Sequence, residues 1–222
     1  MNSILPSIMQ SIKPQYCELI AAGKKTIEVR KTKPKLKPPF KVSIYCTRDK
    51  GILFYRSRHT NDFIAYKPKF YKDTEILLQQ NGHTVFNGKV IGEYICDDIV
   101  ELEYDEFEEC YMFKNCYCGY TLDEILSASC LSYDAFCKYG NRKPIYLWHI
   151  TNLKIYDEPK ELSAFYTIRN KDDLDQCGDC KYIEEYGASF PCEDGGDWWC
   201  SVDNKKPLTR PFQSWGYVYE ID

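Results

Sequence analysis

A compact group of charged and hydroxyl side chains lies near the amino end of this 222-residue chain. Lys25, Thr26, Glu28 and Arg30 bring two cations, a hydroxyl and a carboxylate into one short segment. Lysine and arginine can contact a phosphate or a base carbonyl, while a carboxylate can accept from an amino group or orient a nearby arginine. The segment therefore predicts a binding site for an anionic or strongly polar ligand.

The spacing within this segment is that of a β-strand. Alternate residues of a strand face the same side. Ile27 and Val29 would then face the core. Thr26, Glu28 and Arg30 would line the opposite face as a charged ridge. The alternative interpretation is a surface ion pair between Glu28 and Arg30, which would contribute little.

Short elements on either side are expected to hold this ridge in place. The pattern predicts a strand over 8–12, a helix over 14–22 and a strand over 26–31. Pro14 fits the first position of that helix. Further prolines then break the chain before another strand at 42–46. The ridge would lie on rigid backbone where a helix meets a strand.

Three blocks in this order resemble the ASCH domain of the PUA-like superfamily. They are Ser11-Ile12-Lys13-Pro14, Gly23-x-Lys25-Thr26-x-Glu28-x-Arg30 and Lys41-Val42-x-Ile44-Tyr45. The resemblance continues through 87–92 and 145–150 and fades in the last third, although Arg210-Pro211-x-Gln213-Ser214-Trp215 is similar to a tail of some relatives. It implies a small β-barrel with helices at its ends, a cleft lined by the Lys-Thr-Glu-Arg segment, and recognition of RNA or a modified nucleoside.

The candidate ligand-binding residues lie on the ridge and on the expected strands beside it. Tyr45 and Trp148 could stack on a base. An aromatic residue at a strand position is, however, more often part of the core or its rim. The complete candidate set is Lys13, Lys25, Thr26, Glu28, Arg30, Lys31, Tyr45 and Trp148.

Catalysis is an open alternative, with Lys25, Glu28 and Tyr45 as the candidate catalytic residues. Relatives in the superfamily include amidohydrolases that act on acetylated cytidine, and Lys25 matches their lysine. Glu28 stands where their nucleophilic threonine would be, so that chemistry lacks its nucleophile here. A ribonuclease is the other possibility, because Lys25, Arg30 and Tyr45 could give acid–base help and charge stabilisation to phosphodiester cleavage.

Charge is unevenly distributed along the chain, although the net charge is only −4. Residues 24–41 carry eight cations against Glu28 alone, whereas residues 97–109 carry eight carboxylates and no cation. Only the first stretch would attract phosphates. The sequence thus predicts one basic and one acidic surface.

Strand-like runs outnumber short helical patterns, and few connections resemble repeated βαβ units. This favours an α+β class, with a PUA-like (ASCH) barrel and flanking helices, over a doubly wound sheet. We expect residues 1–158 to form the barrel domain, with 48–86 as a long insertion between barrel strands. Residues 159–222 would form a Cys-rich extension, whose tryptophans could also serve a protein-interaction adaptor.

The twelve cysteines bear on the location and on a metal site. The amino end has no signal-peptide pattern and no apolar run reaches the length of a membrane span, so we expect a cytoplasmic protein with reduced thiols and no membrane partner. Cys177, Cys180, Cys192 and Cys200 form a C-x-x-C knuckle and two single cysteines within a polar stretch. This pattern suits one structural zinc ion. Four reduced surface cysteines are the alternative, and no organic cofactor is implied.

The zinc site predicts a metal content that can be measured. Protein purified under reducing, metal-replete conditions should carry about one zinc ion per chain by mass spectrometry. Cys180→Ser should lose most of it, whereas Cys118→Ser, outside the proposed ligand set, should not. Near-zero zinc in the parent protein would contradict the site.

Overall fold

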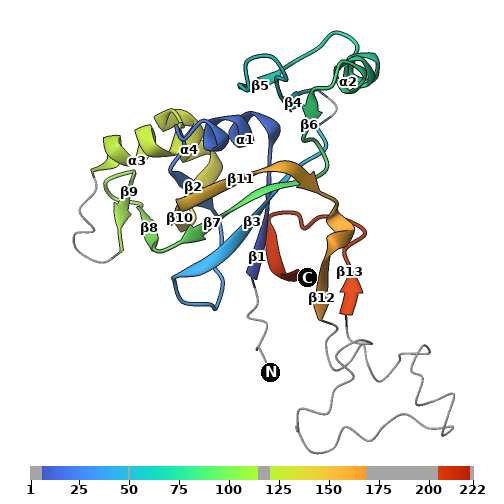
Figure 1. Cartoon of the computed structure of the whole chain (residues 1–222). Coiled ribbons are helices and arrows are strands. Elements are labelled where there is room, and N and C mark those ends of the chain that lie inside the picture. Colours follow the sequence, from blue (N-terminus) through green and yellow to red (C-terminus); the bar gives the residue numbers. More distant parts are fainter. Residues whose placement is uncertain (1–6, 50, 115–120, 169–204, 221–222) are drawn as a thin grey trace, which may run out of the picture.

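The computed structural model describes residues 7–49, 51–114, 121–168 and 205–220 (Figure 1). The strands in these ranges are β1 (Ser7–Ile12), β2 (Ile27–Arg30), β3 (Phe40–Cys46), β4 (Leu53–Arg56), β5 (Phe63–Tyr66), β6 (Thr84–Val85), β7 (Val90–Cys96), β8 (Ile99–Asp105), β9 (Cys110–Phe113), β10 (Ile145–His149), β11 (Thr151–Lys160), β12 (Phe165–Ile168), β13 (Lys205–Pro207) and β14 (Trp215–Glu220). The helices are α1 (Pro14–Ala21), α2 (Tyr71–Gln80), α3 (Leu122–Ser129) and α4 (Tyr133–Gly140), with a 3-10 turn at Leu162–Ala164. Mixed sheets with few helices confirm the α+β class.

The strands form three sheets. The largest has the order β11-β7-β3-β1-β14-β12-β13, the second β2-β10-β8-β9, and the third β5-β4-β6. In the largest sheet β1 pairs in parallel with β3 and antiparallel with β14. The third sheet belongs to the excursion between β3 and β7 and lies with α2 at the top of the view in Figure 1.

The closed barrel that we predicted is not found in the residues described. The first two sheets are joined at one side, where β7 leads into β8 and β10 leads into β11. Closure on the other side would need β2 to pair with the edge of β1. That edge is already occupied, because β14 pairs with β1 from Ser7 to Gln10 and Ser11 N–H donates to the Ser214 carbonyl. Both edges of β1 are therefore used within its own sheet.

Local sequence signals explain how the helix α1 begins and ends. Pro14 is the first residue of α1, and Gly23 follows the helix with a φ of +68°. The N–H groups of Lys24 and Lys25 both donate to the Leu19 carbonyl, which closes the end of the helix as in a Schellman turn. This turn delivers the chain into β2. Glycine is favoured there because other residues rarely adopt a positive φ.

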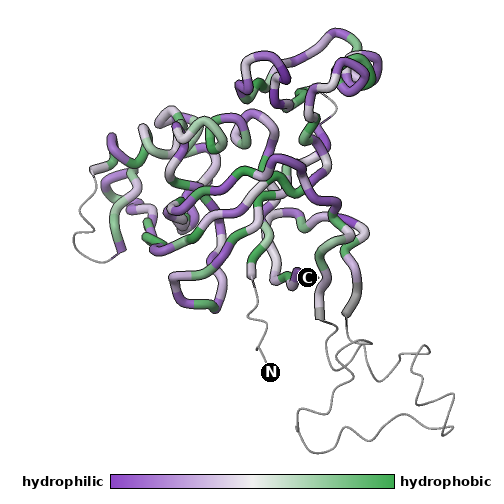
Figure 2. The backbone as a smooth tube through the Cα atoms, viewed as in Figure 1, coloured by the Kyte–Doolittle hydropathy of each residue, from purple (hydrophilic) through white to green (hydrophobic). Residues whose placement is uncertain are grey.

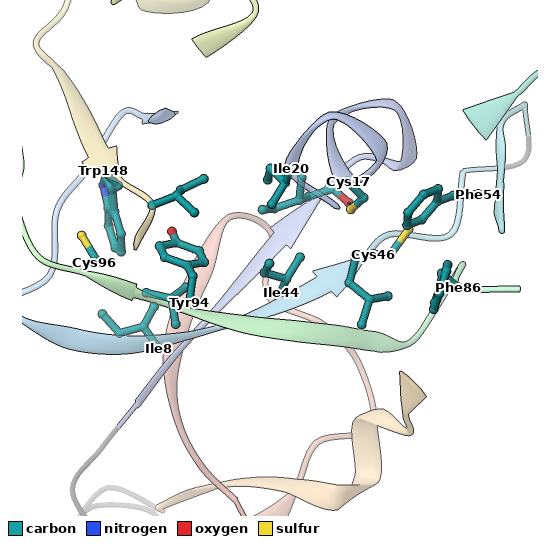
Figure 3. Packing of buried hydrophobic residues seen from close by; sticks show 14 of the residues in the cluster. Ile8, Cys17, Ile20, Ile44, Cys46, Phe54, Phe86, Tyr94, Cys96 and Trp148 are labelled. Atoms are coloured by element: carbon teal, nitrogen blue, oxygen red, sulfur yellow. Dashed lines mark hydrogen bonds between the residues drawn. The ribbon is translucent and has the colours of Figure 1, made fainter. Parts of the chain in front are cut away.

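Three hydrophobic clusters form the core. The main cluster lies between the largest sheet, α1 and the excursion, and Figure 3 shows Trp148, Tyr94 and Phe54 within it. The helix cluster packs α3 and α4 on the second sheet and contains Ile27, Val29, Leu102, Tyr111, Ile125, Phe136, Ile145 and Leu147. The tail cluster contains Met9, Tyr45, Val90, Tyr156, Phe165, Leu208 and Val218. Figure 2 shows apolar residues concentrated along the central strands.

The carboxyl-terminal region contributes β12, β13 and β14 to the largest sheet. Phe165, Leu208 and Val218 contribute buried side chains to the tail cluster, beside Met9 of β1. The described residues of this region are thus packed into the same core as the amino end. In the part of the chain that the structure describes, no helix has the length and apolarity to cross a membrane.

Removal of one side chain of the tail cluster tests this integration. Phe165 is 0% exposed, and Phe165→Ala should lower the free energy of unfolding by about 3–5 kcal/mol because a large buried ring is lost and a cavity remains. Phe107 is 91% exposed, so Phe107→Ala is the matched control and should change stability by less than about 0.5 kcal/mol. Urea denaturation measures both. Equal stabilities of the two variants would show that the tail does not support the fold.

Candidate functional site

The strand β2 has both faces buried. Ile27 and Val29 pack into the helix cluster under α3 and α4. Glu28 and Arg30 point to the other face, where Glu28 is paired in register with Trp148 of β10. The alternation expected from the sequence is present, but the polar face is covered as well. Glu28 is only 7% exposed and Arg30 only 6%.

Lys25, Glu28 and Arg30 form a buried charge cluster. Lys25 Nζ lies 3.3 Å from Glu28 Oε2, and Arg30 Nη2 lies 3.1 Å from Glu28 Oε1. Two cations share one carboxylate, so the cluster has a formal net charge of +1. These side chains are buried, so the cluster is not the solvent-exposed ion pair considered as the alternative. Charges taken out of water interact more strongly, and it costs more to leave one of them unpaired.

The cluster also ties distant parts of the chain together. Lys25 Nζ donates to the Ser129 carbonyl at the end of α3, at 2.7 Å. Arg30 Nη2 donates to the Ser11 carbonyl of β1 at 3.0 Å, and Arg30 Nη1 to Ser214 Oγ at 3.3 Å. The guanidinium thus bridges the two sheets at the side where β2 and β1 share no backbone ladder.

Several buried polar atoms around the cluster have no hydrogen-bond partner among the described residues. The donors are Gln10 Nε2, Arg30 Nε and Trp148 Nε1, and the acceptor is Glu28 Oε2, which contacts Lys25 but accepts no bond of ordinary geometry. Folded proteins leave few buried polar groups unpaired. A polar ligand that reached this place would find both donors and acceptors.

Tyr94 links Gln10 to the charges of Glu28 and Arg30. Its hydroxyl donates to Gln10 Oε1 at 2.8 Å. Burial raises the pKa of Tyr94 well above its usual range, Glu28 adds to the rise and Arg30 opposes it. Tyr94 therefore stays a neutral hydrogen-bond donor at all ordinary pH values.

Aromatic rings surround the cluster. Trp148 is fully buried, and its ring centroid lies 5.8 Å from that of the half-buried Trp215, whose Nε1 donates to Thr32 Oγ1 at 2.9 Å. Lys25 Nζ lies 5.4 Å from the centre of the Tyr16 ring. Such rings offer stacking surfaces to a planar ligand and favourable faces to cations.

Tyr139 of α4 reaches the same region from the helical side. Burial raises its pKa, the Arg30 charge lowers it and the Glu28 charge raises it. Its ring also lies beneath Lys31 Nζ, at 5.1 Å from the ring centre. Tyr139 and the exposed Lys31 thus connect the buried cluster to the surface.

The structure brings only part of the predicted residue set together. Lys25, Glu28, Arg30 and Trp148 meet in the buried cluster. Lys13 is exposed at the start of α1, where its carbonyl accepts from two helix N–H groups. Thr26 is half-buried and its backbone bonds to Ala128 and Ile150, with no hydrogen bond from its hydroxyl to any described residue.

Tyr45 lies apart from the other candidates. Its side chain packs in the tail cluster, on the face of β3 opposite to Ile44 and Cys46, which belong to the main cluster. Burial raises its pKa. The structure therefore does not bring Tyr45 to Lys25 and Glu28, as the catalytic alternative would require.

Gln10, Ser214 and Trp215 reach the site without having been candidates. The signal for the last two was present in the block Arg210-Pro211-x-Gln213-Ser214-Trp215, which resembles a tail of some ASCH domains. Gln10 gave no signal, because a glutamine inside an apolar strand has no distinctive spacing.

The four cysteines of the zinc prediction lie outside the described residues, and among those described no group of three or more His, Cys, Asp or Glu could hold a metal ion.

No family model matches the chain, and neither does any curated protein. Among solved structures, it is similar to the ASCH protein of Zymomonas mobilis, with 16% sequence identity, a TM-score of 0.37, and coverage of 77% of this chain and 77% of that chain. A serine-to-alanine variant of that protein matches with 16% identity and a TM-score of 0.36, over 85% of this chain and 87% of that chain. Both are ASCH structures, the family that the sequence blocks resemble. A likeness this low carries no conclusion about ligand or activity.

The buried cluster makes a prediction for stability. Glu28→Gln leaves two cations without their shared carboxylate and should lower the free energy of unfolding by about 3–5 kcal/mol. Glu106→Gln, at an exposed residue without an ion pair in the described chain, is the control and should change it by less than about 0.5 kcal/mol. Urea denaturation at neutral pH gives both values. A Glu28→Gln variant as stable as the control would mean that the cluster is hydrated and not energetically buried.

Proposed function

We propose that this chain is a nucleic-acid-related binding module that holds RNA or a modified nucleotide at the cluster of Lys25, Glu28 and Arg30. The observation that carries the proposal is the cluster itself. It is buried and net-positive, it lies beside aromatic rings, and among the described residues three donors in or beside it and Glu28 Oε2 have no hydrogen-bond partner, although Glu28 Oε2 forms an ion pair with Lys25. An anion that also carries a planar, hydrogen-bonding ring matches each of these properties. A nucleotide is such a ligand.

The chemistry of a base suits the groups available. Arg30 Nε and Trp148 Nε1 can donate to ring nitrogens or carbonyl oxygens, and Glu28 Oε2 can accept from an exocyclic amino group. Bases of single-stranded RNA are recognised through such edges and by stacking on aromatic side chains. The half-buried ring of Trp215 is the candidate for stacking, since it borders both the cluster and the surface residue Thr32.

Two further features support a nucleic-acid ligand. The resemblance of the sequence blocks to ASCH domains implies recognition of RNA or a modified nucleoside. The expected basic stretch continues directly from Arg30 into Lys31 and the loop that follows β2. Positive charge of this kind attracts phosphates.

Hydrolysis has less support from the geometry. Tyr45 is not beside Lys25, and Lys25 Nζ is already engaged by Glu28 and the Ser129 carbonyl. A protein-interaction adaptor would act through the tryptophans and cysteines of the tail, most of which lie outside the described residues. Binding therefore remains the proposal.

Arginine-specific contacts provide the test. Arg30→Lys keeps the charge but loses the planar fork and Nε, so affinity for single-stranded RNAs should fall about tenfold or more by fluorescence anisotropy. Arg58→Lys, on the exposed face of the excursion, is the matched control and should bind as the parent does.

A second variant keeps the test independent of the buried charges. Trp215→Ala removes a stacking surface and should also weaken binding about tenfold. Circular dichroism and urea denaturation establish that both variants fold. If folded Arg30→Lys and Trp215→Ala bind a panel of RNAs as tightly as the parent, or if the parent binds none, the proposed function is wrong.

A further inference from the structure

The loop between β2 and β3 presents lysines in a regular pattern. Pro34 is buried and Leu36 is half-buried against the main cluster, whereas Lys33, Lys35 and Lys37 are exposed. This alternation places the apolar residues on the inner side and the lysines in solvent, on a loop whose backbone bends at Lys35 and Leu36. The pattern therefore places three ammonium groups on the outer side of the loop.

Contacts with β14 hold this loop in position. The Lys35 N–H donates to the Tyr217 hydroxyl at 2.9 Å, and Thr32 Oγ1 accepts from Trp215 Nε1. Pro34, which is buried, and Leu36, which packs against the main cluster, restrain the loop on its inner side. The lysines thus project from a segment that is held by two hydrogen bonds to β14 and by its apolar contacts.

The loop borders an open hollow of about 570 Å³. Its lining includes Lys33, Lys35 and Lys37, with Asp98 as the single acidic residue. Lys33 is already paired with Glu101, at 2.6 Å. Lys35 and Lys37 have no ion pair with any described residue. The hollow is therefore a positively charged concavity with two cations available to an anion.

The residues that line the hollow follow those of the buried cluster closely in the sequence. Arg30 ends β2, Lys31 follows it, and the lysine loop begins two residues later. Trp215 links the two places physically, since it packs on Trp148 beside Glu28 and bonds to Thr32 of the loop. Lys35 and Lys37 provide two separate ammonium groups on this loop for the phosphates of a strand.

We infer that this hollow is a second subsite, which binds the phosphodiester backbone of the nucleotides next to the one held at the buried cluster. The ligand class is then a single-stranded polynucleotide and not a free nucleoside or mononucleotide. The inference rests on the proposed function, because it requires a nucleotide at the cluster. Unpaired lysines beside a hollow supply sequence-independent phosphate contacts, and the cluster supplies the contacts to one base.

The test compares two ligands and three variants. Fluorescence anisotropy with a labelled single-stranded RNA of about 12 nucleotides measures strand binding, since this length is within the usual site sizes. Isothermal titration with ribonucleoside monophosphates measures binding at the cluster alone. The variants are Lys35→Ala with Lys37→Ala, the charge-conserving Lys35→Arg with Lys37→Arg, and a control, Lys67→Ala with Lys72→Ala, at exposed lysines of the excursion.

We expect the double alanine variant in the loop to bind the RNA about tenfold more weakly, and the slope of log affinity against log salt to become shallower by about 1.4, because about 0.7 is lost for each phosphate contact to a single strand. Its affinity for the monophosphates should stay within about twofold of the parent value, since base and cluster contacts are kept. The arginine variant and the excursion control should bind the RNA as the parent does.

Three results would overturn the inference, and they differ in what they say of the proposed function. If the loop variant binds RNA with the parent affinity and salt slope while Arg30→Lys weakens binding, the subsite is absent but the proposed function stands. If the double alanine variant loses affinity for RNA and for the monophosphates equally, the loop affects the buried cluster and does not bind the phosphodiester backbone. If the parent binds neither ligand, both proposals fail.

Discussion

The carboxylate of Glu28 sets a requirement that much of the surrounding structure meets. A carboxylate taken out of water costs several kcal/mol unless cations and hydrogen bonds compensate it. Lys25 and Arg30 supply the cations, at 3.3 and 3.1 Å. Those cations in turn need partners, and they find them in the carbonyls of Ser129 and Ser11. One buried acid thereby links α3, β2 and β1, and the cluster keeps a formal net positive charge.

The local features of this arrangement were predictable from the sequence, because they depend on residues close together in the chain. Alternation on β2 separated Ile27 and Val29 from Glu28 and Arg30, and Pro14 marked the start of α1. The burial of the charged face was not predictable. It depends on β10 and β14, which are more than a hundred residues away and whose approach leaves no trace in the spacing of residues 25 to 30.

Other features that the sequence did not predict have the same origin. Tyr45 belongs to a correctly predicted strand, yet its side chain packs in the tail cluster with residues of distant segments, among them Phe165 and Val218. A closed barrel was predicted, yet none is found in the described residues, where β14 pairs with the edge of β1. The basic and acidic stretches of the sequence are also less separated in the structure than the two distinct surfaces that we predicted. Glu101, from the acidic stretch, pairs with Lys33 of the basic loop, and the hydrogen bonds from Lys114 and Lys33 lower its pKa.

The pairing of β14 with β1 has a consequence for the order of events during synthesis. Ribosomes release the amino end first, and domains fold as they emerge. Ser214, which bonds to Arg30, and Trp215, which borders the site, are made almost two hundred residues after β2. A nascent chain can thus form the helix α1 and its turn long before Ser214 is available to Arg30. Arg30 therefore lacks one of its hydrogen-bond partners until a segment far along the chain has been synthesised.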